Sequence, residues 1–210
     1  MELEYIFFDV NTIEPQAWKN GGGQTQEIIS FPIGANWSDF IWRVSIATIQ
    51  QSGPFSIFNG IDRIICLLKG DGVILHSQHQ PSHFLNQTLV PYSFKGEQAI
   101  DSEILGPSCD DLNLMTRRGQ ATGSMQIFKH SSELQLEANC FYLCLVQTGQ
   151  WRFSCQNFNA GQTFLECSSR QGFWTPIQQQ ASHLSFSCSS QENFTTSHLI
   201  VMKIQLESAQ

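Results

Sequence analysis

Short runs of alternating apolar and polar residues constrain the fold of this chain more than any other feature. The clearest run spans residues 40–50, where the alternation has the period of two that is typical of a β-strand. One face carries Phe40, Trp42, Val44 and Ile46, and the other carries Ile41, Arg43, Ser45 and Ala47. Similar runs recur along the chain with Gly, Pro or Asn/Ser turns between them, and no long amphipathic helix interrupts them. The pattern predicts an all-β protein built as a sandwich or barrel.

The length of 210 residues and a change of character near residue 124 predict two barrels. We assign residues 1–123 to an N-terminal barrel and residues 124–210 to a C-terminal barrel, in which charges are sparse and Gln and Ser are common. An exchange of strands between the two halves is compatible with this division.

Three local predictions accompany this division. Residues 12–15 should form an N-cap and a short helical turn. Residues 55–58 should form a strand. Residues 77–92 should be polar and irregular.

The charge balance excludes several classes of function. Only 14% of the residues are charged and the net charge is −7, which argues against a nucleic-acid partner and against attraction to an anionic membrane. No run approaches the ~18 apolar residues of a membrane helix, and the acidic start of the chain is unlike a signal peptide. We therefore expect a cytoplasmic protein.

The cysteines agree with this expectation. There are seven, an odd number, and none forms a Cys-x-x-Cys pair. The pattern fits neither a disulfide framework nor a zinc site. Cys140, Tyr142 and Cys144 share one face of a predicted strand and should be part of the core, and Cys66 should be buried and inert.

A polar, glycine-rich stretch at residues 18–27 is the first candidate for function. Three consecutive glycines allow unusual backbone angles and close approach of other groups, and Lys19, Asn20 and Glu27 flank them. By alternation, Thr25 and Glu27 share one face of the strand that follows. The alternative interpretation is an ordinary surface loop.

Cations gather in the first half of the chain, and this suggests an anionic ligand. Five of the 11 Lys and Arg residues are Lys19, Arg43, Arg63, Arg117 and Arg118. A guanidinium group matches a carboxylate or phosphate with two hydrogen bonds. Arg43 is the sharpest case, because it shares a strand face with Ser45. If that face lines a barrel, its head group lies in the lumen, where Glu27 or Asp62 could neutralise it. Internal ion pairs, with Asp62 beside Arg63 and Asp110 and Asp111 near Arg117, are the alternative.

The sequence contains only weak signals for a metal site or for a catalytic nucleophile. His76, His79 and His83 are spaced three and four apart, but Pro81 predicts a loop there and no carboxylate completes a set, so we expect no metal. We find no Gly-x-Ser-x-Gly elbow and no phosphate-binding glycine motif, and we expect no cofactor.

Five stretches together resemble the HutD/Ves family. They are WKNGGGQTQEI at residues 18–28, FIWRVSIA at 40–47, GPFSIFNGIDR at 53–63, LLKGDGV at 67–73 and DLNLMTRRG at 111–119. The second half matches loosely, through its strand pattern and residues 160–163. The resemblance implies a bicupin, two cupin-type β-barrels in one chain, without the histidine and glutamate pattern of metal-binding cupins. It also implies a link to histidine utilisation, where binding of an intermediate such as formylglutamate has been proposed, or to cold and environmental stress.

These observations lead to one main hypothesis and two alternatives. The main hypothesis is that the N-terminal barrel binds a small carboxylate, with a regulatory or accessory role and without catalysis. The first alternative is an isomerase or hydrolase with Glu27 or Asp62 as general base. The second is a structural partner in a stress pathway, and a homodimer is compatible with all three. The candidate ligand-binding residues are Lys19, Asn20, Thr25, Glu27, Arg43, Ser45, Asp62, Arg63, Asn113 and Arg117.

Overall fold

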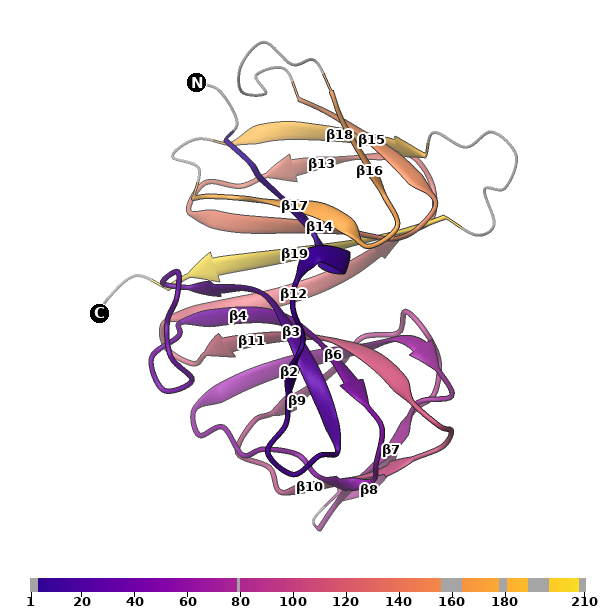
Figure 1. Ribbon diagram of the computed structural model, residues 1–210. Helices are drawn as coiled ribbons and strands as arrows, with labels where there is room; N and C mark the ends of the chain where they lie inside the picture. The colour runs from indigo at the N-terminus through magenta and orange to yellow at the C-terminus, as the bar shows by residue number, and fades with distance from the viewer. Residues whose placement is uncertain (1–3, 79, 156–163, 178–180, 189–196, 208–210) are drawn as a thin grey trace. The chain divides into compact units, whose positions relative to one another are not determined.

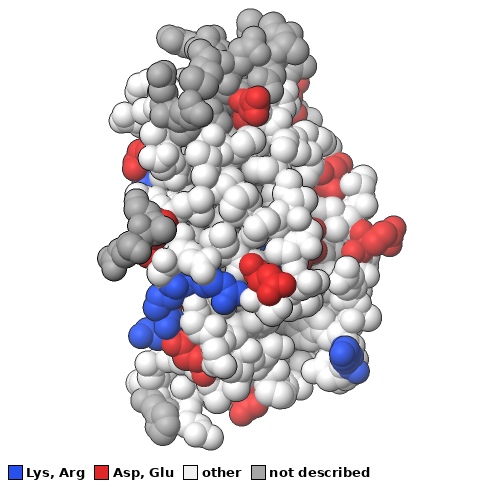
Figure 2. Space-filling view, turned by 90° about the vertical axis from the view of Figure 1, so that its left-hand side faces the viewer, with Lys and Arg blue, Asp and Glu red and all other residues white. Residues whose placement is uncertain are grey.

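Nearly all regular structure in the computed structural model is β-strand (Figure 1). The structure describes residues 4–78, 80–155, 164–177, 181–188 and 197–207. Within these ranges the one helix is a single 3-10 turn, η1 at Val10–Thr12, and none has the length and apolarity needed to span a bilayer. Charged side chains are sparse on the face shown in Figure 2, as the composition predicts. The predicted all-β class is confirmed.

The chain divides into two compact units. One contains Ile13–Gly123 and Glu207–Gln210, and is called the 13–123 unit here; the other contains Met1–Thr12 and Ser124–Leu206, and is called the 124–206 unit. We assigned residues 1–123 to the first barrel. In the structure Met1–Thr12 belongs with the later strands, because its strand β1 (Ile6–Asp9) pairs antiparallel with β17 (Gln171–Thr175).

The 13–123 unit consists of two sheets. The six-stranded sheet has the order β2 (Gln16–Ala17), β3 (Gly23–Phe31), β4 (Trp42–Ile49), β11 (Cys109–Arg117), β6 (Ile61–Gly70) and β9 (Tyr92–Lys95). The four-stranded sheet has the order β5 (Gly53–Pro54), β10 (Ile100–Ile104), β7 (Val73–Ser77) and β8 (Gln80–Leu85). Both sheets contribute to one apolar cluster of Ile49, Ile65, Leu67, Val73, Leu75, Leu85, Phe94, Ile100 and Cys109.

The 124–206 unit is also a pair of sheets. One has the order β1, β17, β14 (Cys140–Thr148), β19 (His198–Leu206) and β12 (Ala121–Phe128). The other has the order β13 (Ser132–Leu136), β18 (Ser182–Cys188), β15 (Gln150–Cys155) and β16 (Leu165–Ser168). Their shared core is rich in aromatic rings, with Trp151, Phe153 and Phe173 fully buried.

The cysteine predictions are confirmed. Cys140, Tyr142 and Cys144 lie in the core of the 124–206 unit, and none of the seven cysteines is part of a disulfide. Cys66 is fully buried, and this burial raises the pKa of its thiol to about 12. A thiol with such a pKa stays protonated at neutral pH, so it is a poor nucleophile.

Two local predictions are wrong, because contacts with residues far away in the chain determine the structure of edge strands and loops. Residues 80–85 form β8 rather than an irregular loop, and Pro81 is tolerated because β8 is the edge strand of its sheet. Residues 55–58 are not a strand, since their backbone bonds, from the Phe55 N–H to the Ile100 carbonyl and from the Phe58 N–H to the Gly96 carbonyl, do not form a regular ladder.

The helical turn also lies earlier in the chain than predicted. It is η1 at Val10–Thr12, because Asp9 rather than Thr12 acts as the cap. The Asp9 carboxylate accepts a hydrogen bond from the Asn11 backbone N–H at 2.9 Å, and the Thr12 hydroxyl donates to the Asp9 carbonyl at 2.8 Å.

The glycine stretch joins β2 to β3 through a tight turn. The Trp18 N–H donates to the Gly23 carbonyl at 2.9 Å, and the Gly21 N–H donates to the Trp18 carbonyl at 3.0 Å. Gly21 has a φ of +70°, which favours glycine. At Gly23 a Cβ would overlap the carbonyl oxygen of Thr48 and lie 3.1 Å from the Trp18 ring. The stretch is therefore a close-packed element rather than a free loop.

We predict that Gly23→Ala lowers the free energy of unfolding by about 1–3 kcal/mol, because the added methyl group pushes β3 away from the Thr48 carbonyl on β4. Gly22→Ala is the matched control, since the nearest atom to its added Cβ is in the flexible Asn20 side chain, at 3.4 Å. Urea denaturation of the three proteins measures both effects. Equal losses for the two variants would contradict the close-approach interpretation.

Candidate functional site

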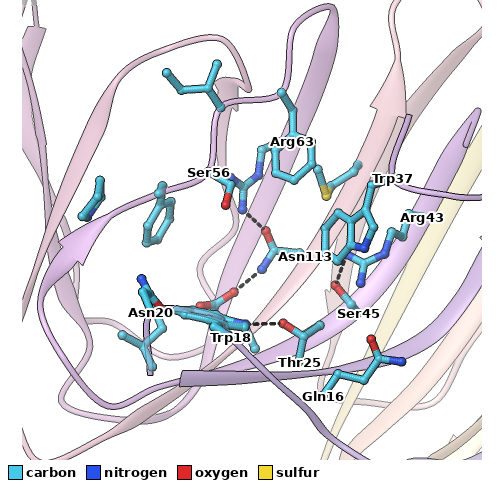
Figure 3. Close-up of a pocket in the computed structure, with 18 of the residues that line it drawn as sticks. Gln16, Trp18, Asn20, Thr25, Trp37, Arg43, Ser45, Ser56, Arg63 and Asn113 are labelled. Carbon is cyan, nitrogen blue, oxygen red and sulfur yellow. Dashed lines mark hydrogen bonds between the residues drawn. The ribbon is translucent and has the colours of Figure 1, made fainter. Parts of the chain in front are cut away.

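A cavity of about 680 Å³ opens in the 13–123 unit against the six-stranded sheet (Figure 3). Its sheet wall comes from β3, β4, β6 and β11, and its remaining walls come from residues 16–20, Trp37 and residues 54–58. Polar side chains on the sheet wall are buried, whereas Lys19, Asn20 and Ser56 are exposed at the mouth. Such a cavity has the size of a small-molecule site.

Strand register arranges the polar side chains of the wall in rows. Met115 on β11 lies opposite Arg43 on β4 and opposite Arg63 on β6. Two residues along β11, Asn113 lies opposite Ser45, and two further, Asp111 lies opposite Ala47. Residues spaced by two share a face of a strand, so an arginine row, an amide row and a carboxylate row follow one another along the wall.

Arg63 is buried with part of its guanidinium group unpaired. The residue is only 8% exposed. Its Nη2 donates to the Asn113 Oδ1 at 2.6 Å, and its Cζ lies 4.8 Å from the centroid of the Phe94 ring. Its Nε has no hydrogen-bond partner among the described residues. Burial lowers the pKa of Arg63 to about 10, so the side chain remains a cation at neutral pH.

Arg43 is paired on one side and covered by an aromatic ring. Its Nε donates to the Glu27 Oε2 at 2.6 Å, and its Nη1 donates to the Ser45 Oγ at 3.1 Å. The Trp37 ring centroid lies 4.2 Å from its Cζ, which is a cation–π contact. Glu27 is thus the partner of Arg43, one of the two partners that the alternation suggested.

Asp111 is the buried carboxyl group of the cavity, at 2% exposure. Burial raises the pKa of Asp111 to about 7, and the positive charge of Arg63 opposes this rise. Asn113 connects the two groups, since its Nδ2 donates to the Asp111 Oδ1 while its Oδ1 accepts from Arg63. The amide therefore separates a guanidinium from a carboxyl group that does not pair with it directly.

Trp18 and Thr25 form the wall near the carboxylate row. The Trp18 Nε1 donates to the Thr25 Oγ1 at 2.8 Å, and Thr25 on β3 lies opposite Ala47. The Asn20 side chain accepts a hydrogen bond from the Gly22 N–H at 3.1 Å, which holds the turn beside the mouth. The glycine stretch thus carries four residues of the cavity lining, Trp18, Lys19, Asn20 and Thr25, and its packing against β4 positions them.

The structure brings most of the sequence-predicted residues together in this cavity. Those that line it are Lys19, Asn20, Thr25, Arg43, Ser45, Arg63 and Asn113.

Glu27, Asp62 and Arg117 do not line the cavity. Glu27 reaches it only through Arg43. Asp62 accepts from the Arg118 Nη2 at 2.7 Å on the surface, because neighbouring residues of a strand point to opposite faces. Arg117 donates to the carbonyls of Ser38 and Phe40 at 2.7 and 2.9 Å, so it holds a loop in place.

The sequence reasoning missed Asp111 and the aromatic lining. Asp111 and Asn113 are two residues apart on one strand, so alternation could have placed them together. Trp18 lies within the glycine stretch, and Trp37 and Phe55 come from loops. Nothing in a loop sequence tells which rings turn toward a cavity.

The histidine positions are outside the cavity. His76 is hydrogen-bonded to Ser82 at 2.9 Å and to Glu103 at 3.0 Å on an exposed sheet face, and His83 stacks on Tyr92. His79 is outside the described residues. In the part of the chain that the structure describes, no group of three or more His, Cys, Asp or Glu side chains is arranged to hold a metal ion.

Comparison with known proteins decides the family. The HutD family model matches residues 10–193 of this chain. The chain belongs to the HutD family. Protein Ves from Escherichia fergusonii is 38% identical over 122 residues, which are 58% of this chain and 62% of the Ves protein. Protein Ves from Citrobacter koseri is 36% identical over the same shares. The chain therefore matches less than two thirds of the length of these relatives.

Solved structures, one of them a HutD protein, have a similar fold. HutD from Pseudomonas fluorescens SBW25 superposes with a TM-score of 0.82 at 20% identity, covering 98% of this chain and 100% of that chain. A conserved protein of unknown function from Pseudomonas aeruginosa PAO1 gives 0.83 at 22% identity, covering 96% and 99%. Oxalate decarboxylase from Lactobacillus farciminis gives 0.63 at 7% identity, covering 95% and 85%. The predicted cupin fold is confirmed.

We predict that Asp111→Asn changes the pH dependence of stability. Unfolded Asp has a pKa near 4, so between about pH 4 and pH 7 the folded wild type binds more protons than the unfolded chain, and its stability falls as pH rises. Asn does not titrate. Between pH 5 and pH 8 the variant should therefore gain on the order of 2 kcal/mol relative to the wild type.

Urea denaturation at the two pH values measures this gain. Asp110→Asn is the comparison variant, because it removes a neighbouring carboxylate that accepts a hydrogen bond from the Thr48 hydroxyl but leaves Asp111 in place. The charge of Asp110 contributes to the raised pKa of Asp111, so this variant should keep a smaller pH dependence than the wild type. A difference between wild type and Asp111→Asn that does not change with pH would contradict the raised pKa of Asp111.

Proposed function

We propose that the cavity of the 13–123 unit binds a small molecule through its carboxylate group. The observation that carries the proposal is the arginine row, in which Arg43 and Arg63 flank Met115 on one cavity wall. Arg63 is the main anchor, because among the described residues its buried guanidinium group is hydrogen-bonded to Asn113 and forms no ion pair with a carboxylate. A carboxylate held beside Arg63 in the cavity would neutralise the buried charge of this guanidinium group.

The balance of charge favours a monoanion over a phosphate. Lys19, Arg43 and Arg63 supply the cations of the lining, and Asp111 supplies a carboxyl group. Glu27 already neutralises Arg43 from outside the lining. What remains is close to one positive charge when Asp111 is ionised, which matches one carboxylate better than a dianionic phosphate.

The aromatic lining supports a ligand with an apolar body. Trp18, Trp37, Phe55 and Phe58 line the cavity together with Ile57 and Met115. Apolar walls with a few convergent polar groups are typical of sites for small metabolites. Acids of histidine utilisation, formylglutamate among them, are the first candidates that family membership suggests, with an accessory or regulatory role for the protein. Formate is a useful minimal probe, since the P. fluorescens HutD structure is described for a formate condition.

We predict that formate, formylglutamate or another small carboxylate raises the melting temperature of the wild type, and that Arg63→Met weakens its binding by about 10- to 100-fold. The variant removes charge-assisted hydrogen bonds to the ligand but keeps a side chain that packs against the Phe94 ring. Isothermal titration calorimetry against a panel of carboxylates, with matched chloride salts as blanks, measures the dissociation constants.

Arg118→Gln is the matched control, because it removes one surface arginine that pairs with Asp62 and Glu97 outside the cavity. Its affinity should equal that of the wild type. The proposal is wrong if no carboxylate in the panel binds the wild type, or if Arg118→Gln and Arg63→Met lose affinity equally.

A further inference from the structure

The carboxylate row of the cavity wall has hydrogen-bonding capacity that the protein leaves unused. A carboxylate offers about four acceptor positions, and among the described residues Asn113 is the one hydrogen-bond donor to Asp111. Asp111 is only 2% exposed and lines the cavity. Buried polar groups are normally satisfied, so a group that enters the cavity is a natural partner.

Among the described residues, the neighbours of Asp111 form no further hydrogen bond with its carboxyl group. Ala47 on β4 and Leu67 on β6 lie opposite Asp111. The Trp18 N–H, which belongs to the same part of the wall, is already donated to Thr25. Arg63 acts on Asp111 by charge and is bonded to Asn113 rather than to the carboxyl group, and Asp110 is the other charged neighbour.

Asn113 makes the two ends of the wall chemically different. Its oxygen faces the guanidinium of Arg63 and its nitrogen faces the carboxyl group of Asp111. Along β11 the wall therefore presents hydrogen-bond donors at the arginine row, then the amide of Asn113, then a hydrogen-bond acceptor at the carboxylate row. The arginine row and the carboxylate row are four residues apart on β11, about 13 Å between Cα atoms, and the side chains between them converge through these hydrogen bonds.

We infer that Asp111 is a second subsite of the cavity, which accepts a hydrogen bond from an N–H or O–H group carried by the same ligand several bonds from its carboxylate. This inference rests on the proposed function, because the arginine row must hold the carboxylate. The ligand class is an acid with a distal hydroxyl, amide or ammonium group. An acid with an apolar tail leaves Asp111 unsatisfied and binds more weakly.

The test compares paired acids that differ in one distal donor. Unbranched acids of three to six carbons, their ω-hydroxy analogues and their ω-amino analogues are titrated into the wild type by calorimetry at pH 8. At the best chain length the ω-hydroxy or ω-amino acid should bind about 10-fold more tightly than the unsubstituted acid, the effect of one hydrogen bond to a charged group. Equal affinities within every pair would overturn the inference while leaving the proposed function intact.

Asp111→Asn distinguishes the subsite from general effects of size and polarity. The variant should lose the preference for the ω-amino acid, because the charge that attracts the ammonium group is gone, and should still bind the unsubstituted acid. Asp110→Asn should keep the preference. A preference for the ω-amino acid over the unsubstituted acid that survives in Asp111→Asn would overturn the inference. If no acid binds the wild type, the proposed function fails and this inference with it.

The wild-type comparison alone decides the matter if Asp111→Asn does not fold. In addition, the wild type should bind the ω-amino acid with release of protons from Asp111 near pH 7, because a nearby ammonium group favours the ionised carboxylate. Titrations in two buffers of different ionisation enthalpy measure this release. Proton uptake in place of release would contradict a contact between the ammonium group and Asp111.

Discussion

Two guanidinium groups are buried in one sheet wall of the 13–123 unit. The polar side chains around them are arranged so that they offset the free-energy cost of burying these charges. A buried charge is tolerated when it is paired and hydrogen-bonded. Arg43 meets this requirement with Glu27, Ser45 and the ring of Trp37. Arg63 meets it only in part, with Asn113 and surrounding rings, and keeps an unpaired Nε. The difference between the two explains why Arg63 is the better candidate for an anion anchor.

The same need to offset buried charge makes the two ends of the cavity wall chemically different. Asn113 lies between Arg63 and Asp111 and uses one end of its amide for each. Direct contact between the two charged groups would form an internal ion pair and leave nothing for a ligand. Because an amide separates them, the guanidinium group and the carboxyl group do not pair with each other, and each can still interact with a ligand in the cavity. A wall of this kind is suited to a ligand with two different polar ends.

Alternation along strands explains both the successes and the errors of prediction from sequence. It grouped Arg43 and Ser45 on one face of β4, and the structure shows that this face lines the cavity. Applied to Asp62 and Arg63, it shows that the two adjacent residues cannot share the cavity, and Asp62 indeed pairs with Arg118. Applied to Asp111, it joins that residue to Asn113. Arg117 escapes the rule, because it lies at the end of β11 and turns to the loop carbonyls of Ser38 and Phe40.

The sequence by itself determined the all-β class and which residues share a face of the long strands, because both depend on a local period of two residues, and it showed that the arginines gather in the first half of the chain. Only the tertiary structure decided which strands are neighbours, so it alone set Met115 between Arg43 and Arg63 and assigned Met1–Thr12 to the 124–206 unit. It also decided that Trp18, Trp37 and residues 54–58 close the cavity. Strand pairing and loop placement depend on contacts between residues far apart in the chain, and a local pattern carries no record of them.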